Sequence, residues 1–205
     1  LTGEEKEPVK AMLLKILKEK YDLEEEDMLS AEIEVVPADK CRDFGLDRSM
    51  LLGYGHDDRV CSFASLEAIL RLPTVPDSTC CCLLADKEEI GSVGATGMRA
   101  HYFENAMAEL LALTQPEYSE LALRRALAAC RMLSCDVSAG YDPLYASCFE
   151  KKNAAYLGRG VCYNKYTGSR GKSGSNDANA EFLGRLRKIM DDNQVAWQTA
   201  ELGKV

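Results

Sequence analysis

The sequence predicts an α/β fold, because short apolar runs with strand character alternate with longer segments of helical periodicity. Residues 80–85 (Cys-Cys-Cys-Leu-Leu-Ala) form an apolar run without alternation, preceded by the turn-like residues 76–78. Such a run is typical of a strand that is buried on both faces. Residues 132–137 form a second short apolar run that predicts another strand.

The first predicted element is an amphipathic helix that begins at Pro8. Its apolar residues recur at helical spacing: Val9, Met12, Leu13, Ile16, Leu17 and Tyr21. Alternation then predicts a half-exposed strand over residues 31–37. Residues 39–49 mix charges with glycine and show no period, which indicates a crossing between two substructures.

A glycine-punctuated turn at residues 53–59 precedes a predicted helix. The apolar residues of this helix are Val60, Phe63, Leu66, Ile69 and Leu70. After the run at 80–85, three glycines spaced as G-x-x-G-x-x-G indicate a flexible loop. The remaining pattern predicts helices over 102–113, 118–129 and 175–192, strands over 154–163 and 195–199, and a loop over 139–153.

The composition excludes several classes of protein. A formal net charge of −8 disfavours nucleic-acid binding. No apolar run approaches the ~18 residues of a membrane span, so we expect no membrane partner and a cytoplasmic location. The nine cysteines are odd in number and contain no Cys-x-x-Cys, which argues against a disulfide framework or a zinc finger.

Acidic residues stand at the ends of three predicted elements. Asp57 lies at the start of a helix, Glu88 and Glu89 follow the run at 80–85, and Asp136 lies in the second apolar run. Singly, each has an ordinary explanation as a helix cap, a solvated loop charge or a polar residue at a strand end. Carboxylates that converge at one crevice repel one another unless a cation lies between them, and two divalent metals there would give a hydrolytic site.

The one basic, glycine-rich loop covers residues 166–174 and ends in a Gly-Lys-Ser sequence that resembles a phosphate-binding loop. The first glycine of that motif would have to be Tyr166, so the nucleotide-binding interpretation is disfavoured. Lys165, Arg170 and Lys172 could instead form a cationic pocket for an acidic side chain, or could simply be exposed.

Three motifs, in order, resemble those of the aspartyl aminopeptidase family: residues 56–61 (HDDRVC), 86–92 (DKEEIGS) and 134–143 (SCDVSAGYDP). The resemblance implies a three-layer, zinc-exopeptidase-like (phosphorylase/hydrolase-like) α/β catalytic domain with two zinc ions. Carried over to this chain, it implies that Asp57 bridges the two zincs, while Glu89 and Asp136 each bind one. Glu88 would be the general base that takes a proton from water.

The resemblance leaves supporting roles around these ligands for His56, Asp58 and Asp86. The family also uses two histidines, one in an early His-x-Asp motif and one near the C-terminus. This chain has only His56 and His101, and neither lies in such a motif. We therefore expect a truncated chain: residues 1–48 as the C-terminal part of an inserted β-rich assembly domain, and 49–205 as a partial catalytic domain.

The function expected from the resemblance is a metal-dependent aminopeptidase that removes N-terminal residues from peptides, acidic residues being one candidate class. By the same resemblance its expected partners are peptide substrates and further copies of itself in a homo-oligomer. Because zinc takes about four ligands, the chain alone should bind zinc weakly and be inactive. The alternative is a non-catalytic assembly or interaction piece derived from a peptidase.

Overall fold

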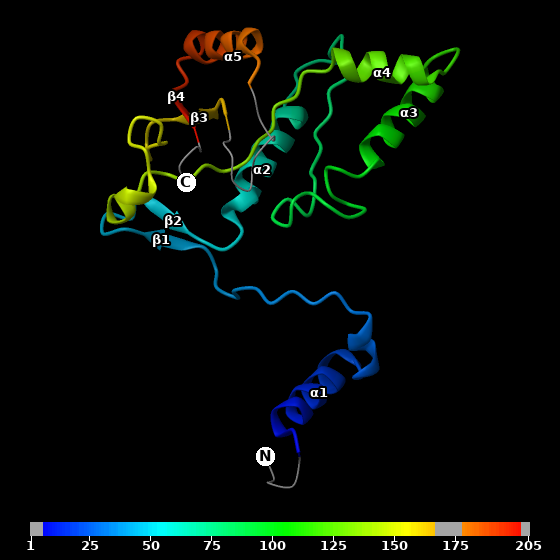
Figure 1. Ribbon diagram of the computed structural model, residues 1–205, viewed down its shortest axis with the longest axis vertical. Coiled ribbons are helices and arrows are strands. Elements are labelled where there is room, and N and C mark those ends of the chain that lie inside the picture. The colour runs from blue at the N-terminus through cyan, green and yellow to red at the C-terminus, as the bar shows by residue number, and fades with distance from the viewer. Residues whose placement is uncertain (1–5, 167–177, 202–205) are drawn as a thin grey trace. The chain divides into compact units, whose positions relative to one another are not determined.

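The computed structural model in Figure 1 describes residues 6–166 and 178–201. It divides into two compact units, Leu1–Tyr54 and Gly55–Val205. Within the described residues, no helix is long and apolar enough to cross a membrane. The assignment of residues 1–48 to an assembly domain and 49–205 to a catalytic domain stays a prediction.

The first unit contains α1 (Pro8–Tyr21), the 3₁₀ helix η1 (Glu26–Leu29) and a hairpin of β1 (Arg42–Phe44) and β2 (Met50–Leu52). The predicted N-terminal helix is confirmed: Pro8 lies at its start, and Asp22 ends it in the left-handed conformation, with φ of 55°. The predicted strand at 31–37 is wrong. Among the residues that the structure describes, no strand pairs with it, and Val35 is 96% exposed.

Helices dominate the second unit: α2 (His56–Leu70), α3 (Tyr102–Thr114), α4 (Glu120–Ala129), the 3₁₀ helix η2 (Pro143–Cys148) and α5 (Ala180–Asp192). The predicted α-helices are confirmed, their bounds shifted by a few residues where the structure describes them. Side chains cap two of them: Ser119 accepts a hydrogen bond from the Ala122 N–H, and Asn179 accepts one from the Phe182 N–H. The helices α3 and α4 pack together as a hairpin (Figure 1).

In the second unit, β3 (Val161–Asn164) runs parallel to β4 (Trp197–Ala200). Val161 is in register with Trp197, and Asn164 with Ala200. Gly160 precedes β3 with φ of 86°, and a Cβ there would collide with the Ala196 backbone, so only glycine fits. The predicted strands at 154–163 and 195–199 are therefore right only in part.

The two apolar runs expected to be strands are not strands in the structure, and Figure 1 draws both as coil. Within the described part of the chain, neither 80–85 nor 132–137 forms a ladder with a neighbour. The burial on both faces expected for 80–85 is also wrong, because Leu83 is 40% and Leu84 56% exposed. A strand is defined by its partner, and an apolar run without one stays irregular.

Candidate metal centre

Two aspartates lie where α2 begins. The cap position is Gly55, in the left-handed conformation with φ of 78°. Asp57 and Asp58 follow with non-helical backbone angles, and the regular turns of α2 start after them. Both carboxylates therefore lie at the N-terminal end of the helix, where the macrodipole favours negative charge.

The third carboxylate comes from a distant part of the sequence. Asp136 lies in the extended segment between α4 and η2, and its Oδ1 accepts a hydrogen bond of 2.7 Å from the Val137 N–H. One carboxylate oxygen each from Asp57, Asp58 and Asp136 lies within 4.8 Å of the other two. We call these three residues the aspartate cluster.

Glu89 joins the aspartate cluster through Asp57. The pKa of Asp57 is raised to about 6, first because desolvation penalises its charge and second because its carboxyl hydrogen-bonds to Glu89. The nearby charges of Asp136, Glu89 and Asp58 raise it further. The pairing of Asp57 with Glu89 and Asp136 agrees with the convergence that the sequence predicts.

The aspartate cluster fits a bound cation. Asp58 Oδ1 is buried, and no hydrogen-bond partner for it lies in the described part of the chain. A buried carboxylate oxygen without a partner is costly, and a cation among several acids removes both this cost and their mutual repulsion. Carboxylate oxygens are accepted ligands of zinc, so the residues present fit that metal.

A tight turn carries Glu88 and Glu89. The Gly91 N–H donates to the Glu88 carbonyl at 2.8 Å, and the Ser92 N–H to the Lys87 carbonyl at 2.7 Å. Glu88, the expected general base, is exposed in this turn, one residue before the glutamate that contacts Asp57. The turn therefore places Glu89 against the aspartate cluster, with Glu88 as its neighbour in the sequence.

Asp86 links the segment before this turn to the segment after it. It forms an isolated parallel bridge with Gly97, and its Oδ2 accepts a hydrogen bond of 3.2 Å from Thr96. The pKa of Asp86 is lowered, chiefly by a hydrogen bond from the Lys87 backbone and then by the Lys87 side chain. A Cβ at Gly97 would collide with the Ser92 carbonyl, so the closure of the turn requires glycine there.

Cys61 was not among the predicted site residues; it lies near the start of α2, three residues after Asp58. The pKa of its thiol is raised to about 12, because it is partly buried and hydrogen-bonds to Asp58, with Cys135 and Asp136 also nearby. Its place in the same six-residue motif as Asp57 and Asp58 is the signal that could have identified it.

The remaining candidates lie as follows. His56 is exposed and begins α2, directly before Asp57. Lys165 is exposed, and its carbonyl accepts a hydrogen bond of 3.0 Å from the Ala178 N–H. Arg170 and Lys172 lie outside the described residues.

Comparison with known proteins gives a consistent result. The profile of the family described as aminopeptidase I zinc metalloprotease (M18) matches residues 1–205. A probable M18 family aminopeptidase 1 from Clostridium acetobutylicum is 57% identical over 203 residues, and the match covers 99% of this chain and 43% of the relative. A protein of the same name from Thermotoga maritima is 45% identical over 205 residues, and the match covers 100% of this chain and 45% of the relative.

Solved aminopeptidase structures also match the chain. The crystal structure of aminopeptidase I from C. acetobutylicum matches with a TM-score of 0.83 at 55% identity, over 99% of this chain and 43% of that one. The M18 structure from T. maritima has a TM-score of 0.82 at 42% identity, over 100% of this chain and 45% of that one. A structure described as the dodecamer of S. cerevisiae mApe1 shares the fold, with a TM-score of 0.65 at 20% identity over 95% of this chain and 44% of that one. The chain thus spans less than half the length of these relatives.

Proposed function

The chain belongs to the M18 family of aminopeptidase I zinc metalloproteases, and on this basis we propose that it carries most of the acidic metal-binding and catalytic residues of a peptide-cleaving aminopeptidase. The observation that carries the proposal is the convergence of Asp57, Asp58 and Asp136 within 4.8 Å, with Glu89 hydrogen-bonded to Asp57. The family description supplies the metal, zinc.

Four acids have proposed roles toward that metal. Asp57 is central, because it hydrogen-bonds to Glu89 and feels the charge of Asp136, so it would be the main ligand. Glu89 and Asp136 would also hold the metal, and Asp58 would add a buried oxygen beside them. When bound, zinc supplies a Lewis acid that acidifies water and polarises the scissile carbonyl.

Glu88 performs the proton transfer in this proposal. It accepts the proton of the attacking water and returns it to the leaving amine, which needs a carboxylate within hydrogen-bond reach of both groups. Its exposure in the turn beside Glu89 leaves it accessible to water. Asp86 maintains the turn through Gly97 and Thr96 rather than taking part in the reaction.

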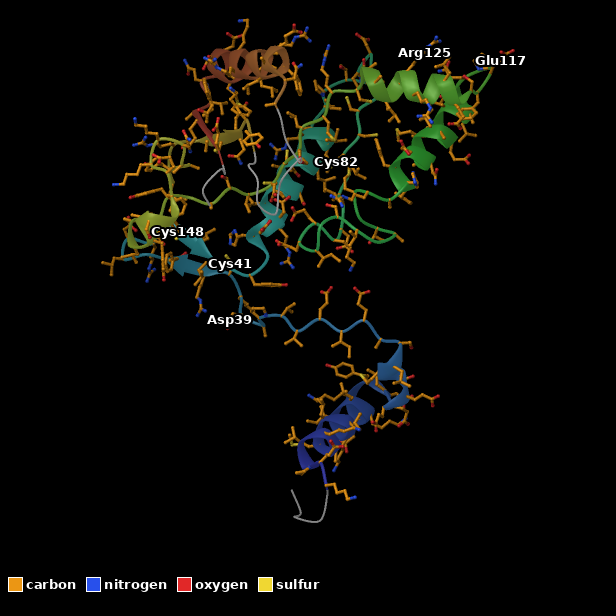
Figure 2. The ribbon with its side chains drawn as sticks, in the orientation of Figure 1. Asp39, Cys41, Cys82, Glu117, Arg125 and Cys148 are labelled. Carbon is orange, nitrogen blue, oxygen red and sulfur yellow. The ribbon has the colours of Figure 1, made fainter. Side chains whose placement is uncertain are left out.

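The test uses a chimera, the C. acetobutylicum aminopeptidase in which this chain replaces the region that matches it. We expect zinc-dependent cleavage of N-terminal residues from short peptides. Glu88→Gln should lower kcat at least 100-fold and leave bound zinc unchanged by metal analysis, because the amide cannot take a proton. Asp57→Asn should lower both kcat and the amount of bound zinc. Glu117→Gln changes an exposed acid in the loop before α4 (Figure 2) and should leave activity unchanged.

Full activity in the Glu88→Gln chimera would refute the assignment of the base. Full zinc occupancy in the Asp57→Asn chimera would refute the assignment of Asp57 as a zinc ligand.

The preference for acidic N-terminal residues is a finer part of the proposal. It is supported by the positive charge of Lys165, Arg170 and Lys172. In the chimera, Lys165→Ala should raise KM for substrates with N-terminal Asp or Glu and leave KM for N-terminal Leu unchanged. Lys188→Ala, in α5, is the matched control. Equal effects on both substrate classes would refute the pocket.

The proposal also includes an oligomeric state and a cellular location. A homo-oligomer is supported by the S. cerevisiae mApe1 structure described as a dodecamer, and light scattering on the chimera tests it. A cytoplasmic location is supported by the nine free cysteines.

A further inference from the structure

Lys87 differs from its neighbours in the motif 86–92, where it is the one basic residue beside three acids. Its backbone is left-handed, with φ of 64°, a conformation that glycine adopts without strain and asparagine more readily than lysine. Its side chain is only 27% exposed, whereas Glu88 and Glu89 are exposed residues. A lysine here is strained in its backbone and partly desolvated in its side chain, which points to a role for its ammonium group.

The ammonium group of Lys87 lies at the bridge that closes the turn. Its Nζ is 3.2 Å from Asp86 Oδ2, the same oxygen that accepts the hydrogen bond from Thr96. Asp86 also forms the parallel bridge with Gly97. The side chains of Lys87, Asp86 and Thr96 therefore join the segment that enters the turn to the segment that leaves it.

The backbone of Lys87 is held in the same turn. Its carbonyl accepts the 2.7 Å hydrogen bond from the Ser92 N–H, so one residue takes part in both the entry and the closure of the turn. Glu89 has its own anchor in the hydrogen bond to Asp57. Glu88 is bonded directly to Lys87, so its placement depends directly on the backbone angles of Lys87.

We propose that Lys87 is a positioning residue for Glu88: its ion pair with Asp86 and its left-handed backbone fix the direction in which the chain enters the turn, and thereby the place of the glutamate that follows. The inference rests on the proposed function, because it takes Glu88 as the group that accepts the proton. In this role Lys87 contacts neither substrate nor metal. Loss of its ammonium group should therefore lower kcat and leave KM and bound zinc unchanged.

The experiment uses the C. acetobutylicum chimera described above. Lys87→Met keeps a long side chain but removes its charge, and should lower kcat about tenfold at unchanged KM and zinc content, because a small misplacement of a catalytic group is enough for such a loss. Lys87→Arg keeps the charge and should restore at least half of the parental kcat. Lys188→Met breaks the 2.8 Å ion pair with Asp192 in α5, and as the matched control it should leave kcat unchanged.

Two further variants separate the charge from the backbone. Lys87→Asn accepts the left-handed conformation but has no ammonium group, so it should resist urea at least as well as Lys87→Met and lose as much kcat. On an Asp86→Asn background, Lys87→Met should cause little further loss, because the charge of its partner is already absent. Hydrogen exchange over residues 86–97, measured without substrate, should be faster in Lys87→Met than in the parent.

The outcomes separate this inference from the proposed function. Parental kcat in Lys87→Met or Lys87→Asn, in a chimera that Glu88→Gln inactivates, would overturn the inference and leave the function standing. Loss of zinc together with kcat, or no recovery in Lys87→Arg, would show a general structural role and overturn it as well. An inactive parental chimera would count against the proposed function, and hydrogen exchange would still decide whether Lys87 holds the turn.

Discussion

Asp57 is the residue on which the candidate centre depends. It is exposed as a whole residue, yet its carboxyl is crowded by three other acids, which together with desolvation raise its pKa from 3.8 to about 6. A proton and a metal ion therefore compete for the same carboxyl, because either one relieves the repulsion.

This competition predicts a pH dependence of zinc binding. Between about pH 5 and about pH 7 the carboxyl of Asp57 loses its proton, so zinc affinity should rise over this window. Zinc titration calorimetry on the chain, in buffers of different ionisation enthalpy, should find proton release that is larger at pH 5 than at pH 7. Asp57→Asn should reduce this release, and pH-independent release in the parent would contradict the assignment.

For the metal-free chain, Asp57 makes the stability of the folded state fall as the pH rises, whereas zinc affinity increases. Because the pKa of Asp57 is raised in the folded chain, the folded state holds this proton more tightly than the unfolded state. The stabilisation of the metal-free folded state by this proton is therefore fully present below about pH 4 and is lost as the pH rises through about 6.

Cys61 should be the least reactive of the thiols near the candidate centre. Its pKa of about 12, against an ordinary 9.0, lowers its thiolate fraction about 1,000-fold at neutral pH, and the thiolate is the reactive form. Alkylation of the chain at about pH 8, followed by peptide mass spectrometry, should label the exposed Cys80 and Cys81 well before Cys61. Equal rates would contradict the placement of Cys61 against Asp58.

At the level of elements, the side chain of Gln198 joins β4 to the segment before β3. Its amide donates to the Tyr156 carbonyl at 2.9 Å, and its carbonyl oxygen accepts from the Tyr156 N–H at 2.9 Å. This pair reproduces the two hydrogen bonds of a strand ladder where β3 itself has not yet begun.

Gln198→Ala should therefore loosen this end of the strand pair. Loss of the two partners leaves part-buried backbone groups unsatisfied, at a cost of about 1–3 kcal/mol. Hydrogen exchange in the chimera should show faster exchange at Tyr156, with little change in helix α4. Gln194→Ala, in the turn before β4, is the matched control. Unchanged exchange at Tyr156 would show that the side chain does not hold this segment.

At the scale of the whole molecule, the described residues bring several acids together but bury few apolar side chains. Only three apolar residues are buried among those described. The free energy of burying apolar side chains is the main stabilising contribution to folding, so most of that contribution is missing from the chain by itself.

We therefore expect no peptidase activity from the chain alone, even with added zinc. Its acids are oxygen ligands only, and zinc in such sites takes about four ligands with nitrogen common among them. Release of N-terminal residues from short peptides, followed by mass spectrometry, should remain at the level of a Glu88→Gln control. Turnover that depends on Glu88 in the isolated chain would contradict this expectation.

The sequence by itself determined the helices and the acid motifs. The hydrogen bonds of a helix join residues four apart, so the periodicity over 102–113 and the Pro8 start suffice to locate α3 and α1. It also marked Asp57, Glu89 and Asp136 as acids that could converge, on the assumption that each followed or preceded a strand or helix.

Only the tertiary structure decided which apolar runs pair and which acids meet. A strand needs a partner from elsewhere in the chain, so the runs at 80–85 and 132–137, apolar as they are, stay unpaired among the described residues. Asp58, which the sequence predicts only in a supporting role, contributes one of the three clustered carboxylates, and Cys61 lies against it through a hydrogen bond. Periodicity records contacts between near neighbours in sequence, whereas burial and convergence depend on segments far apart along the chain.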